Sequence, residues 1–215
     1  SPAQEVRGAS ESSSQQDNDL KEERPMVTIT TQELNRLLAA VNQRSAFGPR
    51  DFNLIVFAAH TGVRVGELVS LTVGQVWHQG APRETLWLPG SVCKTGKGRA
   101  IPLNQRAREA VSNLVGFLRK RGFSTAPEAP LLTKRDHTGV STRLIQRLFQ
   151  DLREKAHLEL PASPHSCRHH FATRICETSG VVQAMKLCGH QRLSSTQVYS
   201  HPTRDDLAAA VAAIE

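Results

Sequence analysis

Apolar residues recur at helical spacing from residue 30 onward. After Thr30 they follow the i, i+3, i+4, i+7 spacing of one helix face, which predicts a helix that continues to about Asn42. Glu33 stands three residues after Thr30 and completes a capping-box signature at the start of this helix. Residues 51–60 are almost wholly apolar and predict a buried helix, with Gly62 in the position that commonly ends one. This part of the chain is therefore expected to be helical.

Further segments carry the same helical period. Helices are predicted for 104–120, with an asparagine at the N-cap, and for 141–157, where an apolar face stands opposite a basic one. Ser163 followed by Pro164 has the form of an N-cap with proline at the first helical position. An alanine-rich segment at 204–214 predicts a last helix.

The pattern changes between residues 77 and 103. T-L-W-L at 85–88 and R-A-I-P-L at 99–103 are short runs typical of strands, and T-G-K-G at 95–98 supplies turn residues between them. We predict a small antiparallel sheet with Lys94 near its hairpin turn. The predicted fold class is α+β, mostly helical with this small sheet.

The N-terminal segment differs from the rest in composition. It is rich in Ser, Gln and charged residues, so 1–25 is expected to be a disordered tail or interdomain linker and 26–215 an ordered domain. The whole chain carries +7, yet its first 24 residues hold six acidic and three basic side chains, which leaves +10 for the remainder. Such a basic domain favours a polyanionic partner, although charge alone is equally compatible with a solvated surface.

The cysteines and the hydropathy argue against several classes of protein. No C-x-x-C pair occurs among the four cysteines and no signal peptide precedes them, so we expect a reduced, cytoplasmic chain. The Cys and His spacing between 167 and 190 fits no common zinc pattern, and no metal site is predicted. No apolar run approaches the length of a membrane span, so no membrane partner is expected.

Candidate chemistry gathers in residues 164–201, where Gly180 and Gly189 separate predicted short helices. This segment holds Arg168, several histidines and Tyr199, the only tyrosine in the chain. Phosphoryl transfer requires a nucleophile surrounded by positive charge. Tyrosine can act as a covalent nucleophile, and the arginine fork binds phosphate oxygens in pairs. The segment therefore predicts phosphoryl-transfer chemistry.

Five motifs, in order, carry a family resemblance. H-S-C-R-H-H-F-A-T at 165–173, L-C-G-H at 187–190 and S-T-Q-V-Y-S-H at 195–201 resemble the closing motifs of the tyrosine recombinases, the phage-integrase family. T-G-V-R-V-G-E-L at 61–68 is similar to the family's first-arginine motif, and C-K-T-G-K-G-R-A-I-P-L at 93–103 is similar to its lysine-bearing hairpin. The resemblance extends from about Met26 to the C-terminus.

The resemblance implies a reaction and its partners. A tyrosine oxygen attacks a DNA phosphodiester and forms a 3′-phosphotyrosyl link, which a 5′-hydroxyl later reverses. Because the bond energy is retained, the reaction needs neither metal nor other cofactor. The implied function is site-specific recombination of double-stranded DNA. The chain is expected to be a monomer without DNA and to self-associate on DNA, as a tetrameric synapse.

The same resemblance implies a role for each catalytic residue. These roles are Tyr199 as nucleophile, Arg64 and Arg168 as the clamp on the nonbridging phosphate oxygens, Lys94 as general acid with Lys97 as its rival, His165 as acceptor of the tyrosine proton, and His190 as hydrogen-bond donor to a nonbridging oxygen. Glu67 could orient the Arg64 guanidinium, and an exposed glutamate in a first helical turn is nearly as good an interpretation. Six basic side chains are candidate contacts to DNA phosphates, although charge runs are more often solvated: Lys97, Arg99, Lys134, Arg135, Arg143 and Arg147.

Two other functions and one departure from the family remain. A type IB topoisomerase shares this chemistry without exchanging strands, and a non-catalytic module could use the fold only to bind DNA. Most members carry a helical DNA-clamping domain ahead of the catalytic one, where this chain has only its polar segment. A truncated chain is our favoured interpretation and a reduced recombinase is the alternative.

Overall fold

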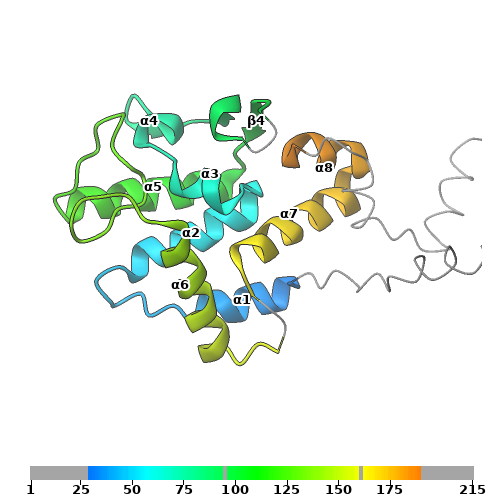
Figure 1. The fold of residues 1–215 in the computed structure, drawn as a ribbon, viewed down its shortest axis with the longest axis horizontal. Coiled ribbons are helices and arrows are strands. Elements are labelled where there is room, and N and C mark those ends of the chain that lie inside the picture. Colours follow the sequence, from blue (N-terminus) through cyan, green and yellow to red (C-terminus); the bar gives the residue numbers. More distant parts are fainter. Residues whose placement is uncertain (1–28, 94–95, 160–161, 190–215) are drawn as a thin grey trace, which may run out of the picture.

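The computed structural model describes residues 29–93, 96–159 and 162–189 (Figure 1). The predicted tail at 1–25 and the predicted helix at 204–214 lie outside these ranges, as do Lys94, His190 and Tyr199. The division into a tail and one domain therefore stays a prediction.

The described residues are mostly helical. Their elements, in chain order, are α1 (Thr31–Ala39), α2 (Gly48–Thr61), α3 (Val65–Val69), α4 (Val73–Val76), β1 (Trp77–His78), β2 (Ala81–Pro82), β3 (Thr85–Leu88), the 3-10 helix η1 (Gly90–Val92), β4 (Arg99–Pro102), α5 (Gln105–Lys120), α6 (Thr142–Lys155), α7 (Pro164–Ser179) and α8 (Val181–Cys188).

Side-chain caps start four of the longer helices. Thr30 and Glu33 form the predicted capping box of α1, in which Glu33 Oε2 accepts the Thr30 N–H at 2.8 Å. The side chains of Asn104, Ser141 and Ser163 each accept the backbone N–H three residues on, at the starts of α5, α6 and α7. These caps confirm the predicted helix starts. The starts could be predicted because a capping side chain bonds to a backbone N–H only a few residues away. The end of α1 was predicted about three residues late.

Helix α2 lies at the centre and ends where α7 approaches it (Figure 1). It packs against α5 on one side and α7 on the other. Gly62 caps it with φ of +61°, a left-handed conformation that glycine adopts without a steric penalty. A Cβ at Gly62 would lie 2.3 Å from Cδ1 of Phe171 on α7. Glycine is thus required both for the turn and for the close approach of α7.

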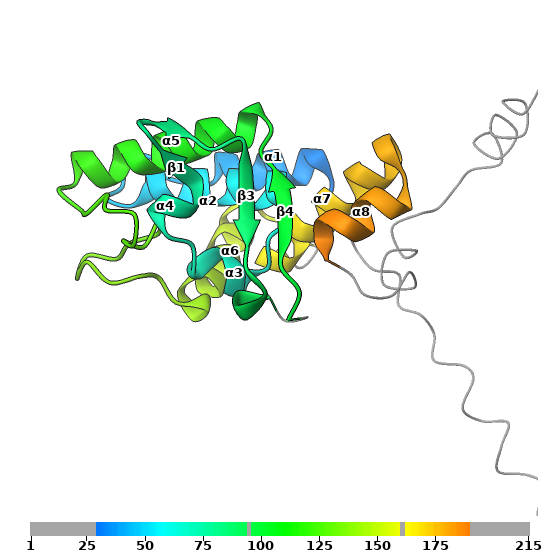
Figure 2. The same cartoon turned by 90° about the horizontal axis from the view of Figure 1, so that it is seen from above.

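The predicted antiparallel sheet is formed by β3 and β4, in a register that pairs Leu88 with Arg99 (Figure 2). Side chains on β4 alternate, so that Arg99 and Ile101 are buried and their neighbours exposed. Helix α8 contacts β4. A second sheet of β1 and β2 was not predicted, because it is only two residues long on each side and turns through Gln79 and Gly80 at positive φ.

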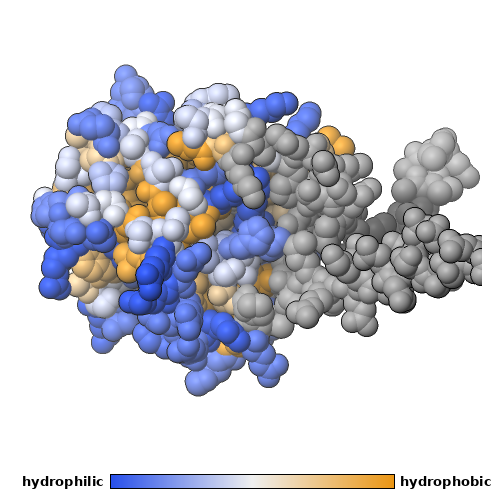
Figure 3. Space-filling view, in the orientation of Figure 1, coloured by the Kyte–Doolittle hydropathy of each residue, from blue (hydrophilic) through white to orange (hydrophobic). Residues whose placement is uncertain are grey.

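Polar residues cover most of the face shown in Figure 3, and apolar residues gather toward its centre. Within the described ranges, no helix combines the length and the apolar character needed to cross a membrane.

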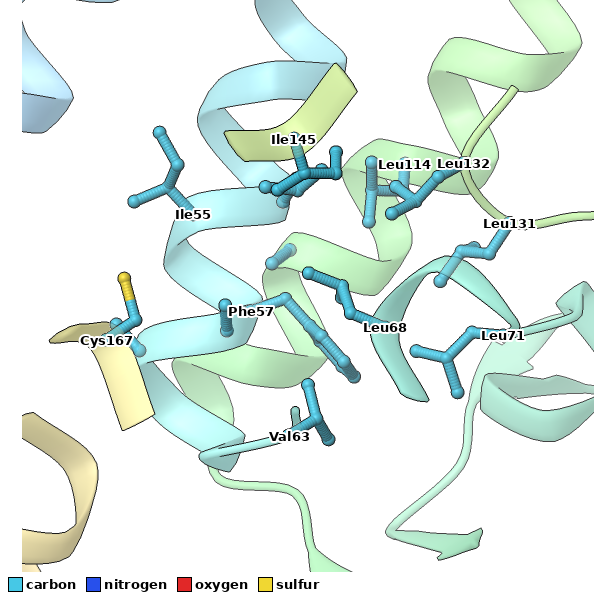
Figure 4. Close-up of a cluster of buried hydrophobic side chains, with 14 of the residues drawn as sticks. Ile55, Phe57, Val63, Leu68, Leu71, Leu114, Leu131, Leu132, Ile145 and Cys167 are labelled. Carbon is cyan, nitrogen blue, oxygen red and sulfur yellow. The ribbon is translucent and has the colours of Figure 1, made fainter. Parts of the chain in front are cut away.

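The core joins the central helix to the elements that carry the candidate site. Phe57 on α2 is fully buried and points toward Leu68 of α3 and Val63 (Figure 4). Leu68 is the residue after Glu67, and Val63 is the residue before Arg64. Burying large side chains at this density leaves little freedom for the backbone. The core therefore holds the segment around Arg64 in place.

Candidate active site

Arg168 lies in the second turn of α7 and is only 2% exposed. Its Nη1 donates to the Gly62 carbonyl at 2.6 Å, and its Nη2 donates to the Cys188 carbonyl. A buried guanidinium must be hydrogen-bonded, because the unpaired charge would cost several kcal/mol. Arg168 thereby joins the end of α2 to the end of α8.

Arg64 is the N-cap residue of α3, and its side chain is 23% exposed. Its backbone N–H donates to Glu67 Oε2 at 2.7 Å, and its Nη1 donates to Glu67 Oε1 at 3.1 Å. Its Nη2 reaches the Gly189 carbonyl at 3.4 Å. The side chain is thus directed across the start of α3 toward the end of α8.

The C-terminal end of α8 brings three arginines together. The last carbonyls of a helix have no partner within it and form the negative end of its dipole. Three consecutive carbonyl oxygens here each accept from a different arginine: Leu187 from Arg99 Nε at 3.0 Å, Cys188 from Arg168 Nη2, and Gly189 from Arg64 Nη2 at 3.4 Å. The guanidinium groups of Arg64 and Arg168 therefore lie side by side.

Glu67 is the acidic partner within this cluster. It is 1% exposed, and its two oxygens accept from Arg99 Nη1 at 2.8 Å and Arg99 Nη2 at 2.7 Å, in addition to Arg64. Burial alone would raise the pKa of Glu67, but the hydrogen bonds and charges of Arg99 and Arg64 outweigh it and lower the pKa. Glu67 is therefore ionised, and the alternative of an exposed first-turn glutamate is wrong.

His165 lies one turn before Arg168 in α7 and is exposed. Its ring meets that of His169 edge to face, with centroids 4.1 Å apart. Desolvation of the ring, followed by the positive charges of Arg168 and Arg64, lowers the pKa of His165 below its usual range. The imidazole is consequently neutral at physiological pH and able to accept a proton.

Two of the buried thiols, Cys167 and Cys188, are poor nucleophiles. Burial raises the pKa of Cys167 to about 12, and burial raises that of Cys188 as well. The four cysteines are free, and the described part of the chain contains no group of three or more side chains suited to hold a metal. Thiolate chemistry at Cys167 or Cys188 is therefore disfavoured at neutral pH.

The candidate DNA contacts fall into two groups. The side chains of Lys97, Arg135, Arg143 and Arg147 are exposed, and Lys134 is half-exposed and paired with Asp136 at 3.2 Å. Arg99, by contrast, is 8% exposed and its guanidinium is engaged inside the protein. A DNA contact from Arg99 finds no support in this geometry. The other five contacts stay predictions.

Two features of the cluster escaped the sequence analysis. The first is the inward position of Arg99. A signal for it existed, because side chains alternate along a strand and Arg99 therefore lies on the same face as the apolar Ile101. The second is the capping of α8 by three arginines, for which no local signal exists because the partners come from distant segments. Lys94, His190 and Tyr199 lie outside the described residues, so their roles are untested.

Comparison with known proteins covers most of the chain. A family model described as "Phage integrase family" matches residues 28–205. The tyrosine recombinase XerC of Vibrio campbellii is 32% identical over 187 residues, which cover 84% of this chain and 56% of that relative. The tyrosine recombinase XerD of Halalkalibacterium halodurans is 26% identical over 177 residues, covering 82% and 57%. The chain thus spans little more than half the length of these curated relatives.

Solved structures share the fold. The crystal structure of XerA recombinase has a TM-score of 0.65 and 25% identity, and the match covers 88% of this chain and 65% of that one. A post-cleavage complex of the XerH site-specific recombinase with palindromic difH substrate has a TM-score of 0.71 at 20% identity, covering 91% and 55%. The predicted fold class, a mostly helical α+β domain with a small antiparallel sheet, is confirmed, and the structure adds the second sheet. The family model, matched over most of the residues, and the arginine cluster built from its motifs together show that this chain belongs to the phage integrase family, the tyrosine recombinases.

Proposed function

We propose that this chain is the catalytic domain of a site-specific recombinase that cleaves and rejoins duplex DNA through a 3′-phosphotyrosyl intermediate. The observation that carries the proposal is the convergence of Arg64 and Arg168 on adjacent carbonyls at the end of α8, with His165 close enough for both charges to lower its pKa. Family membership supports the same reaction.

The two guanidinium groups match the charge that develops on the reacting phosphate. The transition state carries two nonbridging oxygens, and preorganised donors aimed at such charge supply much of enzymatic rate enhancement. Each guanidinium has five N–H donors. Within the described residues, Arg64 and Arg168 each use only two of their side-chain nitrogens for hydrogen bonds. Each guanidinium therefore keeps N–H groups that form no hydrogen bond to a described residue.

The remaining steps concern protons. The Tyr199 oxygen attacks phosphorus and gives its proton to His165, while the bond to the 5′-oxygen breaks. Lys94 protonates the departing 5′-oxygen, and His190 donates a hydrogen bond to a nonbridging oxygen. The reverse sequence, with a 5′-hydroxyl of another strand as nucleophile, rejoins the DNA and releases the tyrosine. No atom or electron needs an outside reactant.

Double-stranded DNA is the proposed partner. Solved relatives include XerH on difH substrate and a lambda integrase dimer on a COC′ core site. The cations proposed to contact DNA phosphates are Lys97, Lys134, Arg135, Arg143 and Arg147. We propose a monomer in the absence of DNA, self-association into a tetrameric synapse on DNA, and a cytoplasmic, DNA-bound location.

Covalent trapping tests the proposed function. The 215-residue chain is mixed with a pool of duplexes of random sequence, each nicked so that the short 5′-hydroxyl strand diffuses away after cleavage. We expect a DNA–protein adduct that survives denaturation, forms in the presence of a metal chelator, and carries a DNA subset that sequencing identifies. Absence of any adduct contradicts the proposal. Exchange of strands between two labelled sites separates recombination from topoisomerase-like relaxation.

The pH dependence of the cleavage rate is expected to reflect the protonation of His165. Neutral imidazole is the active form, and its pKa is lowered, so the rate should rise with pH to a midpoint below about 6.5, the usual value for histidine. His165→Asn should remove this rise and slow cleavage by roughly 10²–10⁴-fold, the usual contribution of a general base. Single-turnover cleavage from pH 5 to 8 measures both effects. The exposed His78 supplies the control variant His78→Asn, and a midpoint above 6.5 would contradict the assignment.

A change of leaving group distinguishes which of Lys94 and Lys97 is the general acid. Lys94→Ala should slow cleavage of ordinary DNA and regain most of the rate when sulfur replaces the bridging 5′-oxygen, because a thiolate leaves without a proton. Lys97→Ala is the matched control and should cleave both substrates at rates near those of the unaltered chain. Rescue of Lys97→Ala alone would reverse the assignment.

A further inference from the structure

Arg99 makes more contacts across the site than any role in binding DNA would require. Its two Nη atoms hold both oxygens of Glu67, at 2.8 and 2.7 Å, and its Nε donates to the Leu187 carbonyl at 3.0 Å. Its Nη1 also lies 3.5 Å from Cys93 Sγ. One buried side chain on β4 thus touches α3, the end of α8 and the segment after η1.

The contact with Glu67 leads directly to Arg64. Glu67 receives Arg99 on both oxygens and Arg64 through its backbone N–H and its Nη1. Burial alone would lower the pKa of Arg99, but the Glu67 hydrogen bonds and charge outweigh it and raise the pKa. The carboxylate is therefore held in one orientation by Arg99, and that orientation decides where the Arg64 guanidinium lies.

The contact between Arg99 and the end of α8 also connects Arg99 to the two clamp arginines. Gly189 follows α8 with φ of +64°, and a Cβ there would lie 3.1 Å from Arg99 Cδ. The backbone after α8 therefore packs directly on the Arg99 side chain. The carbonyls of Cys188 and Gly189, which hold the two clamp arginines, belong to this same turn.

We infer that Arg99 is a positioning residue, which sets the geometry of the Arg64–Arg168 clamp by orienting Glu67 and by holding the end of α8. This inference rests on the proposed function, since it assigns Arg99 a part in charge stabilisation at the phosphate.

Packing alone does not account for a charged residue at this position. Arg99 shares the buried face of β4 with Ile101, and a buried ion pair adds little stability over apolar residues of similar volume. What an arginine supplies here is direction: its planar fork matches both oxygens of a carboxylate, whereas the lysine ammonium is a point charge without this geometry. Arg99→Lys therefore keeps the charge and removes the orientation.

The test compares two substrates for each variant. One is the nicked duplex selected by the unaltered chain, and the other carries a methylphosphonate at the scissile position, which removes the negative charge that the clamp must neutralise. Arg99→Lys should cleave the phosphate roughly 100-fold more slowly, the scale expected for a misplacement of about 1 Å. On the methylphosphonate its loss should be much smaller. Arg64→Ala should show the same pattern, and the double variant should lose less rate than the product of the two single losses, because the two substitutions act in part on the same interaction.

A matched control exists outside the arginine cluster. Arg36 on α1 also caps a helix end, with Nη2 donating to the carbonyls of Ala156 and His157 at 2.8 and 3.0 Å. Arg36→Lys should cleave both substrates at unchanged rates. Glu67→Gln provides a second approach to the Arg99 pair and should reproduce the substrate pattern of Arg99→Lys.

The outcomes are distinguishable. If the unaltered chain forms no adduct, the proposed function and this inference are both wrong. If the unaltered chain forms an adduct and Arg99→Lys cleaves the phosphate substrate at the same rate as the unaltered chain, only this inference is wrong. Equal losses on phosphate and methylphosphonate, in both Arg99→Lys and Glu67→Gln, also overturn it, because loss of folded protein slows the two substrates alike.

Discussion

Tyr199→Phe is expected to abolish the covalent DNA adduct completely. The substitution removes one oxygen atom, the proposed nucleophile, and retains the aromatic ring. Because Tyr199 is the only tyrosine in the chain, no second phenol can replace it. Nor can the buried thiols of Cys167 and Cys188 do so, since burial raises the pKa of each and keeps it protonated at neutral pH.

Two measurements make this result specific. DNA affinity, measured by fluorescence anisotropy, should be nearly unchanged, because the phosphate clamp and the basic surface are intact. Ser200→Ala removes the neighbouring hydroxyl and should still form the adduct. A denaturation-resistant adduct from Tyr199→Phe would show that another side chain attacks the phosphate.

Local signals in the sequence predicted the helices well. The starts of α1, α5 and α7 follow from Thr30, Asn104 and Ser163, because a capping side chain bonds to a backbone N–H only three residues away. Strand β3 and strand β4 also followed from their short apolar runs. What could not be predicted is the second, two-residue sheet, since so short a pairing carries almost no periodicity.

The candidate site depends on contacts that the sequence states only indirectly. Arg64 and Arg168 were expected to act together from their motifs, yet the reason that they meet lies in the carbonyls at the end of α8. The same holds for Glu67 on helix α3, whose buried carboxylate is paired with Arg99 from strand β4. Residues far apart in the chain are brought together by packing of α2, α7 and α8, and no local pattern encodes such a meeting.

The burial of Arg168 has a consequence for stability as well as for the reaction. Arg168→Ala would leave the Gly62 and Cys188 carbonyls without their donor, at a cost of roughly 1–3 kcal/mol for each buried group. The vacated space adds a cavity term. We expect the free energy of unfolding, measured with denaturant, to fall by roughly 3–5 kcal/mol from these costs together.

The reaction should suffer independently of this loss. Removing one preorganised donor to a developing charge typically slows a reaction by roughly 10²–10³-fold, so cleavage per folded molecule should fall by at least that factor. Arg64→Ala should lose as much rate, but less stability, because its side chain is 23% exposed whereas Arg168 is 2% exposed.

The charge of Arg168 also has an effect that can be measured without DNA. Because that charge helps to hold the pKa of His165 down, Arg168→Ala should raise the pKa of His165 toward its usual value, as followed by NMR titration. Arg36→Lys, which changes an arginine outside the cluster, is the control and should leave the pKa of His165 unchanged. If the His165 pKa does not move while the protein stays folded, Arg168 and His165 do not share one electrostatic site. The two arginines would then act on the phosphate, if at all, without coupling to the proposed base.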